Sequence, residues 1–545
     1  MGDEEEATPT LDAADMALVT QLGVPRQVQE GEYLYREGDV AYDFFVLVSA
    51  EVDIVVAVDG GERVIVRHGP GRFLGELNML SGLRVFVSAR VVTAGEVVAV
   101  ARDRLRQLMA TKPGLGDTIL AAFVARRGLL MTEAAPAIRV IGSHFSPESL
   151  RIREFLGRIR VPHEWLDADR DLQVEALLGH FGIAATELPV VIATGTVLRR
   201  ATPGDVAGYL GLTVESLPER CFDLVVIGGG PAGLAAAVYG ASEGLRTLGV
   251  EMTAPGGQAA CSSRIENYLG FPMGVSGEEL TQRAIIQAEK FGANLTAPCT
   301  VVSLASRAGY LMARLSDGSE VAGRAVIAAT GASYRRLEAS GLSDFEGNGV
   351  YYAATDMEVR MCGLSPVVVV GGGNSAGQAA IFLSQGGCAV TLVIRGPDLG
   401  KDMSRYLVER IEADPHITLR TRTTVLALEG DETLRAVHLD GPDDGKVVLR
   451  CAGLFSFIGA DPTSGWLNGC AALDDRGFVL TDLSLTPDQL GQGWQTLARS
   501  PLPFETSHPG LFAVGDLRSG STKRVAAAVG EGSASVRSVH QYLAF

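Results

Sequence analysis

The sequence predicts a multidomain protein in which a β-rich barrel or jelly roll precedes several α/β units. Two observations predict this fold class. Over residues 30–125, short apolar strands are separated by glycine turns at regular spacing. From residue 137 onward, strands and helices alternate, and two glycine-rich turns each stand between a strand and a helix. The length of 545 residues fits about three to five domains.

The β-rich unit is predicted over residues 15–130. Its glycine turns divide it into strands, and an apolar helical pattern follows them. We expect strands at 44–47, 52–58, 64–66, 85–92 and 96–101, then helices at 105–109 and 118–130. A stretch of small residues at 132–136 is the predicted linker to the next unit.

A small α/β unit is predicted over residues 137–215 from three alternations of strand and helix. The expected strands are 138–141, 164–167 and 190–193, and the expected helices are 147–156, 172–181 and 203–210. A second linker, 215–220, leads into the part of the chain that carries the glycine-rich turns.

Composition excludes several classes of function. With 47 Lys and Arg against 64 Asp and Glu, the net charge is −17, so nucleic acid is not an expected partner. The acidic amino terminus is unlike a signal peptide, and the apolar run 224–241 is broken by glycines and a proline, so we expect a cytoplasmic protein without a membrane partner. Seven cysteines without any Cys-x-x-Cys exclude a disulfide framework and a cysteine-rich metal site, and no metal is predicted.

The first glycine-rich turn predicts a dinucleotide site. An apolar strand, 224–227, runs into Gly228-Gly229-Gly230-Pro231-Ala232-Gly233, and a helix follows. Glycines let the backbone approach a pyrophosphate, and the amino end of the helix favours its charge. The next strand ends at Glu251, where a carboxylate can bind ribose hydroxyls.

The second glycine-rich turn, Gly371-Gly372-Gly373-Asn374-Ser375-Ala376, follows the strand 367–370. Here the next strand ends at Arg395, so the charge at this position is opposite to that of Glu251. A guanidinium binds the 2′-phosphate that a carboxylate would repel. We therefore predict FAD at the first turn and NADPH at the second, with NADH as the alternative. Two such sites on one chain predict hydride transfer through a flavin.

The region 222–545 resembles the low-molecular-weight thioredoxin reductases, which are pyridine nucleotide-disulfide oxidoreductases. The shared motifs after the first turn are Gly256-Gly257-Gln258, Glu266-Asn267, Ala329-Thr330-Gly331, Gly515-Asp516 and Lys523-Arg524-Val525. The resemblance implies an FAD domain in two parts, 221–335 and 461–545, around an inserted NAD(P)H domain, 336–460, with both Rossmann-like. It also implies a homodimer. The FAD-binding residues it implies are Gly228, Gly230, Pro231, Ala232, Gly233, Glu251, Gly257, Gln258, Asn267, Thr330, Gly331, Gly515, Asp516, Arg524 and Val525, and those for NAD(P)H are Gly371, Gly373, Asn374, Ser375, Ala376 and Arg395.

One departure from that family bears on the chemistry. Where the family has its redox-active cysteine pair, this chain has Ala353 and Asp356. Neither side chain can accept electrons from a flavin and exchange them with a disulfide. The catalytic acceptor residue is thus unassigned, and the flavin is expected to reduce a non-local acceptor such as ferredoxin, flavodoxin or a quinone.

Residues 137–215 resemble a thioredoxin or glutaredoxin domain that lacks its thiols. Ser146 and Ser149 stand where the family has Cys-x-x-Cys, and Leu188-Pro189 matches its cis-proline. The resemblance implies a docking or structural role without redox chemistry.

Residues 30–125 resemble a cyclic nucleotide-binding domain through Glu37-Gly38-Asp39 and the run from Gly71 to Leu77. The resemblance implies a cyclic-nucleotide site at Gly75, Glu76 and Arg84, in which Glu76 takes the ribose 2′-hydroxyl and Arg84 the cyclic phosphate. The spacing from Glu76 to Arg84 is short, and bulky residues follow Arg84, so both binding and loss of binding stay open.

Three functions therefore remain. The first is an FAD-dependent NAD(P)H oxidoreductase with a small redox protein or quinone as acceptor, regulated by a cyclic nucleotide. The second is a thioredoxin reductase with unorthodox thiols, for which Cys261 is the candidate. The third is a scaffold that keeps its nucleotides as structural or sensory ligands.

Overall fold

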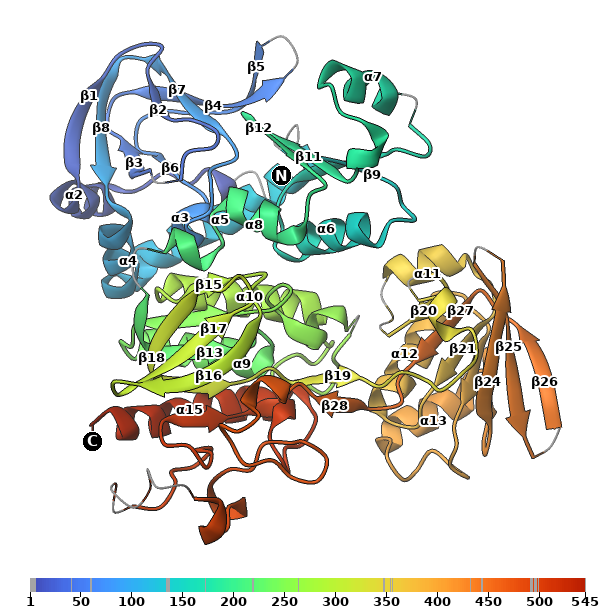
Figure 1. The fold of residues 1–545 in the computed structure, drawn as a ribbon. Coiled ribbons are helices and arrows are strands. Elements are labelled where there is room, and N and C mark those ends of the chain that lie inside the picture. Colours follow the sequence, from blue (N-terminus) through green and yellow to red (C-terminus); the bar gives the residue numbers. More distant parts are fainter. Residues whose placement is uncertain are drawn as a thin grey trace.

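The structure is a computed structural model. It describes residues 6–40, 42–58, 61–133, 138–171, 173–217, 220–262, 264–346, 348–352, 354, 356–431, 433–442, 445–490, 494, 497 and 499–544. Figure 1 shows a β domain (blue) and a small α/β unit (teal) above a lobe that combines green and red segments, with a second lobe (yellow and orange) beside it. Among the described residues, none of the helices is both long enough and apolar enough to cross a membrane.

The β domain consists of two antiparallel four-stranded sheets. This agrees with the β-rich unit that the sequence predicts from strands separated by glycine turns. One has the order β1-β8-β3-β6 and the other β2-β7-β4-β5. Their bounds are β1 Val24–Val28, β2 Tyr33–Tyr35, β3 Phe44–Leu47, β4 Glu51–Val58, β5 Gly61–His68, β6 Phe73–Leu74, β7 Ser88–Thr93 and β8 Gly95–Val100. The predicted strand 85–92 begins later, at Ser88, because Val85 bonds to the loop residue Asp39.

Four helices flank these sheets: α2 (Ala13–Leu22), α3 (Asn78–Ser81), α4 (Arg102–Thr111) and α5 (Pro113–Glu133). The sequence predicts α4 and α5, although both are longer than expected. Helix α2 was not predicted. It is capped by Asp12, whose carboxylate accepts from the Asp15 amide at 2.8 Å.

The α/β unit has the sheet order β10-β9-β11-β12, in which only the β9–β10 pair is parallel. Its elements are β9 Ile138–Gly142, α6 Pro147–Arg158, β10 His163–Asp167, α7 Gln173–His180, β11 Val190–Ala193, β12 Thr196–Arg199 and α8 Pro203–Leu210. All six predicted elements are confirmed, and β12 is an addition that follows β11 through a hairpin at Gly195. The Leu188–Pro189 bond is cis.

The first lobe has the sheet order β15-β14-β13-β18-β17-β16, with β29 paired to β18. The elements before the second lobe are β13 Cys221–Ile227, α9 Pro231–Ser242, β14 Thr247–Val250, α10 Gly277–Lys290, β15 Asn294–Thr296, β16 Val301–Arg307, β17 Tyr310–Leu315 and β18 Glu320–Ala328. The chain returns to this sheet with β29 (Leu511–Ala513) and then α15 (Val525–Ala544). Helix α15 crosses α9 so closely that a Cβ on Gly532 would lie 2.0 Å from the Ala232 oxygen.

The second lobe has a parallel sheet, β20-β27-β21-β22-β23, and an antiparallel sheet, β24-β25-β26. Its elements are β20 Val350–Tyr351, α11 Asp356–Cys362, β21 Val367–Val370, α12 Asn374–Gln385, β22 Val390–Val393, α13 Arg405–Ala413, β23 Ile417–Arg420, β24 Thr424–Gly430, β25 Leu434–Gly441, β26 Gly445–Arg450 and β27 Gly453–Ser456. The two crossings between lobes, β19 (Ala332–Tyr334) and β28 (Ala460–Pro462), pair with each other (Figure 1). The second lobe is thus inserted into the first, while the boundaries at residues 335/336 and 460/461 stay predictions.

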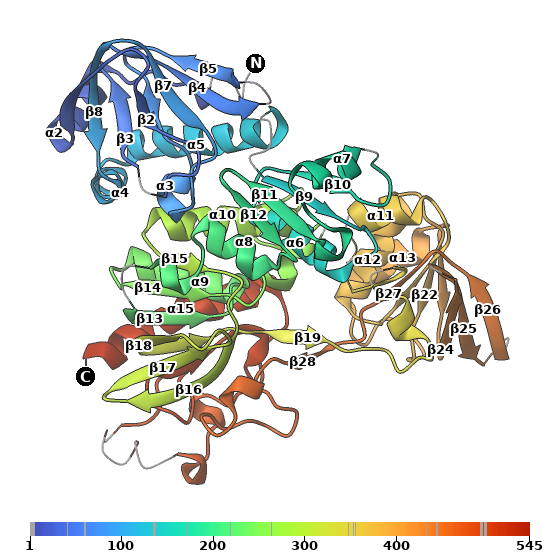
Figure 2. The same ribbon diagram turned by 45° about the horizontal axis from the view of Figure 1, so that its top comes forward.

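The α/β unit shares a core with its neighbours, so the units are packed against one another. Leu83 and Phe86 of the β domain and Ala254 and Ala297 of the first lobe join the buried side chains of α6 and α8 in one cluster. Figure 2 shows α6 and α8 lying over α10 of the first lobe. A hydrogen bond of 2.6 Å from the Gln282 amide of α10 to the Arg158 oxygen of α6 fixes this contact.

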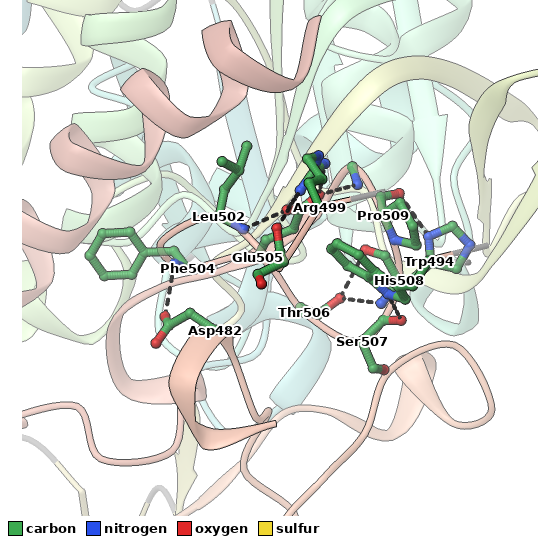
Figure 3. Close-up of polar contacts among 12 residues, drawn as sticks. Asp482, Trp494, Arg499, Leu502, Phe504, Glu505, Thr506, Ser507, His508 and Pro509 are labelled. Atoms are coloured by element: carbon green, nitrogen blue, oxygen red, sulfur yellow. Dashed lines mark hydrogen bonds and ion pairs between the residues drawn. The ribbon is translucent and has the colours of Figure 1, made fainter. Parts of the chain in front are cut away.

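The segment before β29 is held by a buried ion pair (Figure 3). Glu505 is fully buried, and its carboxylate accepts from the Arg499 guanidinium at 2.6 and 2.9 Å. It also accepts from the amides of Leu502 at 2.8 Å and Gly510 at 2.9 Å. Because Gly510 directly precedes β29, this pair fixes the start of the strand that leads to Gly515 and Asp516.

Candidate functional site

The first glycine-rich turn joins β13 to α9 and leaves no room for side chains at Gly228 and Gly233. Gly228 has φ +109°, and a Cβ there would lie 2.3 Å from the Ala329 oxygen. A Cβ on Gly233 would lie 1.8 Å from the Gly228 oxygen. Pro231 occupies the first turn of α9, where its missing N–H costs nothing. The main-chain amides at the amino end of α9 are therefore not covered by side chains of the turn, and they can meet an anionic pyrophosphate.

The opposite wall of this turn is the segment at Gly256 and Gly257. The Gly256 amide donates to the Gly229 oxygen at 2.7 Å. Gly257 has φ +56°, and a Cβ there would lie 2.7 Å from the Gly230 Cα. A side chain at Gly257 would run into the main chain of Gly230, so the observed glycines keep the two walls close and fit a dinucleotide such as FAD.

Glu251 lies at the end of β14, beside the turn. Its carboxylate accepts from the Gly229 amide at 2.6 Å and from the Thr253 amide at 3.0 Å. These two bonds hold a half-buried negative charge next to the cradle, at the position where the sequence predicts contact with ribose hydroxyls.

Gly515 and Asp516 lie across from the amino end of α9. A Cβ on Gly515 would lie 2.9 Å from the Ala232 Cβ, and the Gly515 amide donates to Glu531 at 2.7 Å. Burial raises the pKa of Asp516, whose main-chain oxygen accepts from the Lys523 ammonium at 2.8 Å. The main chain of this motif is thus fixed from α15 and the residues just before it.

Other predicted FAD residues lie at the crossings or at the surface. Thr330 donates its hydroxyl to the Thr463 oxygen at 2.7 Å, and the Gly331 oxygen accepts from the Thr463 amide at 3.0 Å. The Gln258 amide donates to the Ala332 oxygen. Asn267 and Arg524 are exposed, and Val525 begins α15.

The second glycine-rich turn joins β21 to α12 in the same way. Gly371 has φ +142°, and a Cβ there would lie 2.3 Å from the Phe457 oxygen. Gly373 precedes α12 and carries no contact closer than 4.0 Å at its Cβ position, so the turn is open on that side. Asn374 accepts from the Ser404 amide at 2.6 Å, which ties the turn to the segment before α13.

The remaining residues predicted for NAD(P)H differ in exposure. Ala376 is buried in α12, whereas Ser375 is exposed at its amino end. Arg395 is exposed just after β22. The contact of Arg395 with a 2′-phosphate stays a prediction of the sequence.

The two lobes meet at an ion pair and a cavity. Glu266 of the first lobe pairs with Arg410 of α13 at 2.7 Å. Asn267, Met273 and Tyr406 line an adjacent cavity of about 420 Å³. The predicted flavin segment and the NAD(P)H lobe therefore face each other across an open space.

The segment in which the sequence predicts the missing cysteine pair is described only in part. Ala353 and the side chain of Asp356 lie outside the described residues. Their neighbour Ala354 forms a parallel bridge with Ser262, which directly follows Cys261. Burial raises the pKa of the Cys261 thiol. Ala354 therefore lies beside the segment that follows the predicted flavin-binding residues Gly257 and Gln258.

Sequence reasoning missed Arg158 of α6, because no local pattern marks a contact between domains. One Nη atom of Arg158 donates to the oxygens of Ala254 and Gly257, both at 3.0 Å. Its side chain is largely buried. The thiol-less α/β unit thus holds the main chain of the flavin-binding wall.

We expect Arg158→Gln to weaken FAD binding by about 1–2 kcal/mol, or roughly tenfold, because the wall loses its charged donor. Arg151→Gln, at an exposed position of the same helix, is the matched control. FAD release during dilution, followed by flavin fluorescence, measures the effect. Equal release from both variants would show that Arg158 does not hold the wall.

The serines that replace the expected thiols of the α/β unit have structural positions. Ser146 caps α6 by accepting from the Ser149 amide at 3.3 Å, and Ser149 is fully buried. Close by, His144, Asp167 and Asp169 bring their ligand atoms within 4.8 Å of one another, in a group that the sequence did not single out. The Asp167 carboxylate lies 3.0 Å from His144 Nδ1.

The predicted cyclic-nucleotide residues do not come together in one place. Gly75 and Glu76 line a cavity inside the β domain. Arg84 instead lies between the two domains, where its guanidinium donates to the Tyr209 oxygen of the α/β unit and, at 2.6 Å, to the Gly38 oxygen of the β domain. Arg84 therefore does not line the cavity that Gly75 and Glu76 line.

His68 lines this cavity, and its burial predicts a pH dependence. Burial lowers the pKa of His68 from 6.5 to about 3. Below pH 6.5 the unfolded chain binds a proton there that the folded chain does not, so stability falls as the pH falls. We expect this side chain to cost about 1 kcal/mol of stability between pH 7 and about pH 5.5.

Urea denaturation followed by circular dichroism at several pH values tests this expectation. His68→Gln should flatten the acid limb of the stability curve, whereas His416→Gln, at an exposed position, should leave it unchanged. If His68→Gln kept the full pH dependence, the neutral buried histidine would be ruled out as its source.

Comparisons with known proteins agree with this site. Residues 222–532 match the model of the pyridine nucleotide-disulphide oxidoreductases, and residues 25–112 match that of the cyclic nucleotide-binding domain. The thioredoxin reductase of Treponema pallidum (strain Nichols) is 32% identical over 326 residues, which are 60% of this chain and 98% of that protein. The thioredoxin reductase of Mycolicibacterium smegmatis is 33% identical over 330 residues, 60% of this chain and 99% of that one.

Solved structures give the same result. The thioredoxin reductase of T. acidophilum is similar with a TM-score of 0.54 and 27% identity, covering 60% of this chain and all of that one. That of Lactococcus lactis is similar with a TM-score of 0.52 and 27% identity, over 59% and 99% of the two chains. The family binds FAD and NAD(P)H, in agreement with the two glycine cradles. This chain belongs to the pyridine nucleotide-disulphide oxidoreductase family, as a thioredoxin reductase-like enzyme fused to an amino-terminal cyclic nucleotide-binding domain.

Proposed function

We propose that this enzyme transfers hydride from NADPH to FAD and passes the electrons to an acceptor outside the chain, such as ferredoxin, flavodoxin or a quinone. The observation that carries the proposal is the residue pair Ala353 and Asp356, together with the absence of any Cys-x-x-Cys in the sequence. Reduction of a substrate disulfide through the enzyme needs a thiolate that receives electrons from the flavin.

The remaining cysteines support this proposal. Burial raises the pKa of Cys261, and it raises the pKa of Cys362 and of Cys451 to about 12. A raised pKa lowers the thiolate fraction and therefore the reactivity of a thiol. All seven cysteines are free, and four of them are buried.

The choice of NADPH over NADH is part of the proposal and is supported by Arg395. When bound, FAD supplies the hydride acceptor and the means to pass on electrons singly. The chain supplies the two cradles, the carboxylate of Glu251 at the first and the exposed guanidinium of Arg395 at the second. We further propose that the enzyme is a homodimer.

A second candidate is a disulfide reductase that uses Cys261. It is favoured by the bridge between Ser262 and Ala354, which places Cys261 next to the segment of the missing cysteine pair. The names of the relatives, thioredoxin reductases, point the same way. Against it stands the lack of a second cysteine close to Cys261 in the sequence.

Steady-state NADPH oxidation with a panel of acceptors separates the two candidates. We expect turnover with ferredoxin, flavodoxin or a quinone, no turnover with thioredoxin, and unchanged rates for Cys261→Ser. Sustained reduction of thioredoxin that is lost in Cys261→Ser would replace the first candidate with the second.

A further inference from the structure

One imidazole and two carboxylates meet at the carboxyl end of two strands in the α/β unit. Strands β9 and β10 are parallel neighbours, and Gly142 pairs with Asp167, so both strands end at the same edge of the sheet. His144 follows β9, Asp167 is the last residue of β10, and Asp169 lies two residues further on. The fold therefore brings together side chains from two segments, and their ligand atoms all lie within 4.8 Å of one another.

The distances within this group match those between the ligands of one metal ion. His144 Nδ1 lies 3.0 Å from an oxygen of Asp167 and 3.4 Å from an oxygen of Asp169. Donor atoms that surround an ion at about 2.1 Å are about 3.0 Å apart in an octahedron and about 3.4 Å apart in a tetrahedron. The donor atoms are therefore spaced as they would be around one ion.

The charge of the group favours a cation. Both carboxylates face the same nitrogen of His144, and a single proton on that nitrogen cannot neutralise both of them. Within the described residues, the guanidinium atom closest to either carboxylate is Arg170 Nε, which lies 4.0 Å from Asp167. The side chain of Asp167 is 13% exposed and that of Asp169 is 39% exposed. An ion can therefore reach the group from solvent on the side of Asp169.

A buried hydroxyl beside this group is a second, independent indication of a ligand. Ser149 is fully buried, and its Oγ has no hydrogen-bond partner among the described residues. A Cβ on Gly142 would collide with this Oγ and would lie 3.2 Å from Trp165, so the hydroxyl lies on the face of the sheet that carries Trp165. Asp167, two residues after Trp165, points to the same face. Buried hydroxyls nearly always have a partner, and a water bound to an ion at this edge would supply one.

We propose that His144, Asp167 and Asp169 bind one divalent transition-metal ion, and that Zn²⁺ is the ion that fits them best. One imidazole nitrogen and two carboxylate oxygens are ligands typical of Zn²⁺. Ca²⁺ instead takes about six to eight oxygen ligands. The set of protein ligands leaves at least one position for water or for an oxygen atom of a bound solute.

The proposed metal site is separate from both glycine cradles. It lies where α6 begins, beside Ser146, which caps that helix. The contact of α6 with the flavin-binding wall is made by Arg158 at the other end of the helix. The metal ligands take no part in the proposed flavin chemistry, so either proposal can fail without the other.

Isothermal titration calorimetry of the full-length protein, freed of metals with a chelator, tests the proposal with Zn²⁺ and Ca²⁺ as probes. Because the chain has seven free cysteines, Zn²⁺ binding is compared between variants rather than judged from the wild type alone. We expect His144→Gln and Asp169→Asn each to weaken one Zn²⁺ site at least about tenfold, since loss of an outer partner of a ligand already costs that much. Ca²⁺ should not compete for this site.

His180→Gln is the matched control, because His180 is an exposed histidine at the end of α7 in the same unit. It should bind Zn²⁺ as the wild type does. No Zn²⁺ binding by the wild type, unchanged binding in His144→Gln and Asp169→Asn, or an equal loss in His180→Gln would overturn the proposal. Competition by Ca²⁺ at equal affinity would also overturn it, because the site would then be a cluster of acidic residues only. Asp169 is the more exposed ligand, so its variant keeps the test valid if His144→Gln fails to fold.

Discussion

Replacing Glu505 by glutamine is expected to destabilise the protein by about 3–5 kcal/mol. The carboxylate is fully buried and accepts four hydrogen bonds, two of them from Arg499 (Figure 3). Glutamine removes the charge and leaves the guanidinium, whose side chain is 13% exposed, without its counterion. Removal of one partner from a buried ion pair costs far more than the pair itself contributes.

The same change should also loosen FAD, because Glu505 holds the amide of Gly510 just before β29 and the Gly515–Asp516 motif. Urea denaturation followed by flavin and tryptophan fluorescence measures both effects. The matched control is Glu279→Gln, which breaks an exposed pair with Arg283 in α10 and should cost less than about 0.5 kcal/mol. Similar losses in the free energy of unfolding for the two variants would contradict the claim that burial makes the Glu505 pair costly to break.

The second large effect is expected at Gly233. An alanine Cβ there would lie 1.8 Å from the Gly228 oxygen, which belongs to the main chain and cannot rotate away. The turn must shift, and overpacking of this kind costs about 1–3 kcal/mol. We therefore expect Gly233→Ala to bind FAD roughly tenfold to a hundredfold more weakly.

Gly530→Ala is the matched control, because Gly530 lies in α15 of the same lobe and has open space around its Cβ position. There alanine should be neutral or slightly stabilising, since it favours the helix. The FAD content of the purified variants, measured by absorbance, compares the two. Full FAD content in Gly233→Ala would contradict the assignment of this turn as the flavin cradle.

The sequence predicted the parts of the protein that depend on local signals. Each glycine turn lies directly between a strand and a helix, so the patterns at Gly228 and Gly371 were sufficient to place both cradles. The strand Phe44–Leu47 and the helix Pro203–Leu210 were predicted with the bounds that the structure has, because turns or caps mark both ends of each. Helix α2 carries no comparable apolar pattern, since its apolar residues do not gather on one face.

Contacts between distant segments could not be predicted in this way. Arg158 donates hydrogen bonds to Ala254 and Gly257 across a domain boundary, and Arg84 donates one to the Tyr209 oxygen of the neighbouring α/β unit. For both arginines, the residues next to them in the sequence do not predict their hydrogen-bond partners. The sequence also gave no reason to pair Glu531 with Gly515, which α15 brings together by crossing the sheet.

Anaerobic titration with NADPH tests the central claim most directly, because it counts the electrons that the enzyme can store. A thioredoxin reductase-like enzyme in which the flavin alone is reduced takes up about two electron equivalents per FAD. An enzyme with a redox-active disulfide as well takes up about four. We predict that the flavin absorbance is fully bleached after about two electron equivalents, which is about one NADPH per FAD, and that no thiols appear. Uptake of about four equivalents with two new thiols would contradict the claim that this enzyme has no disulfide relay.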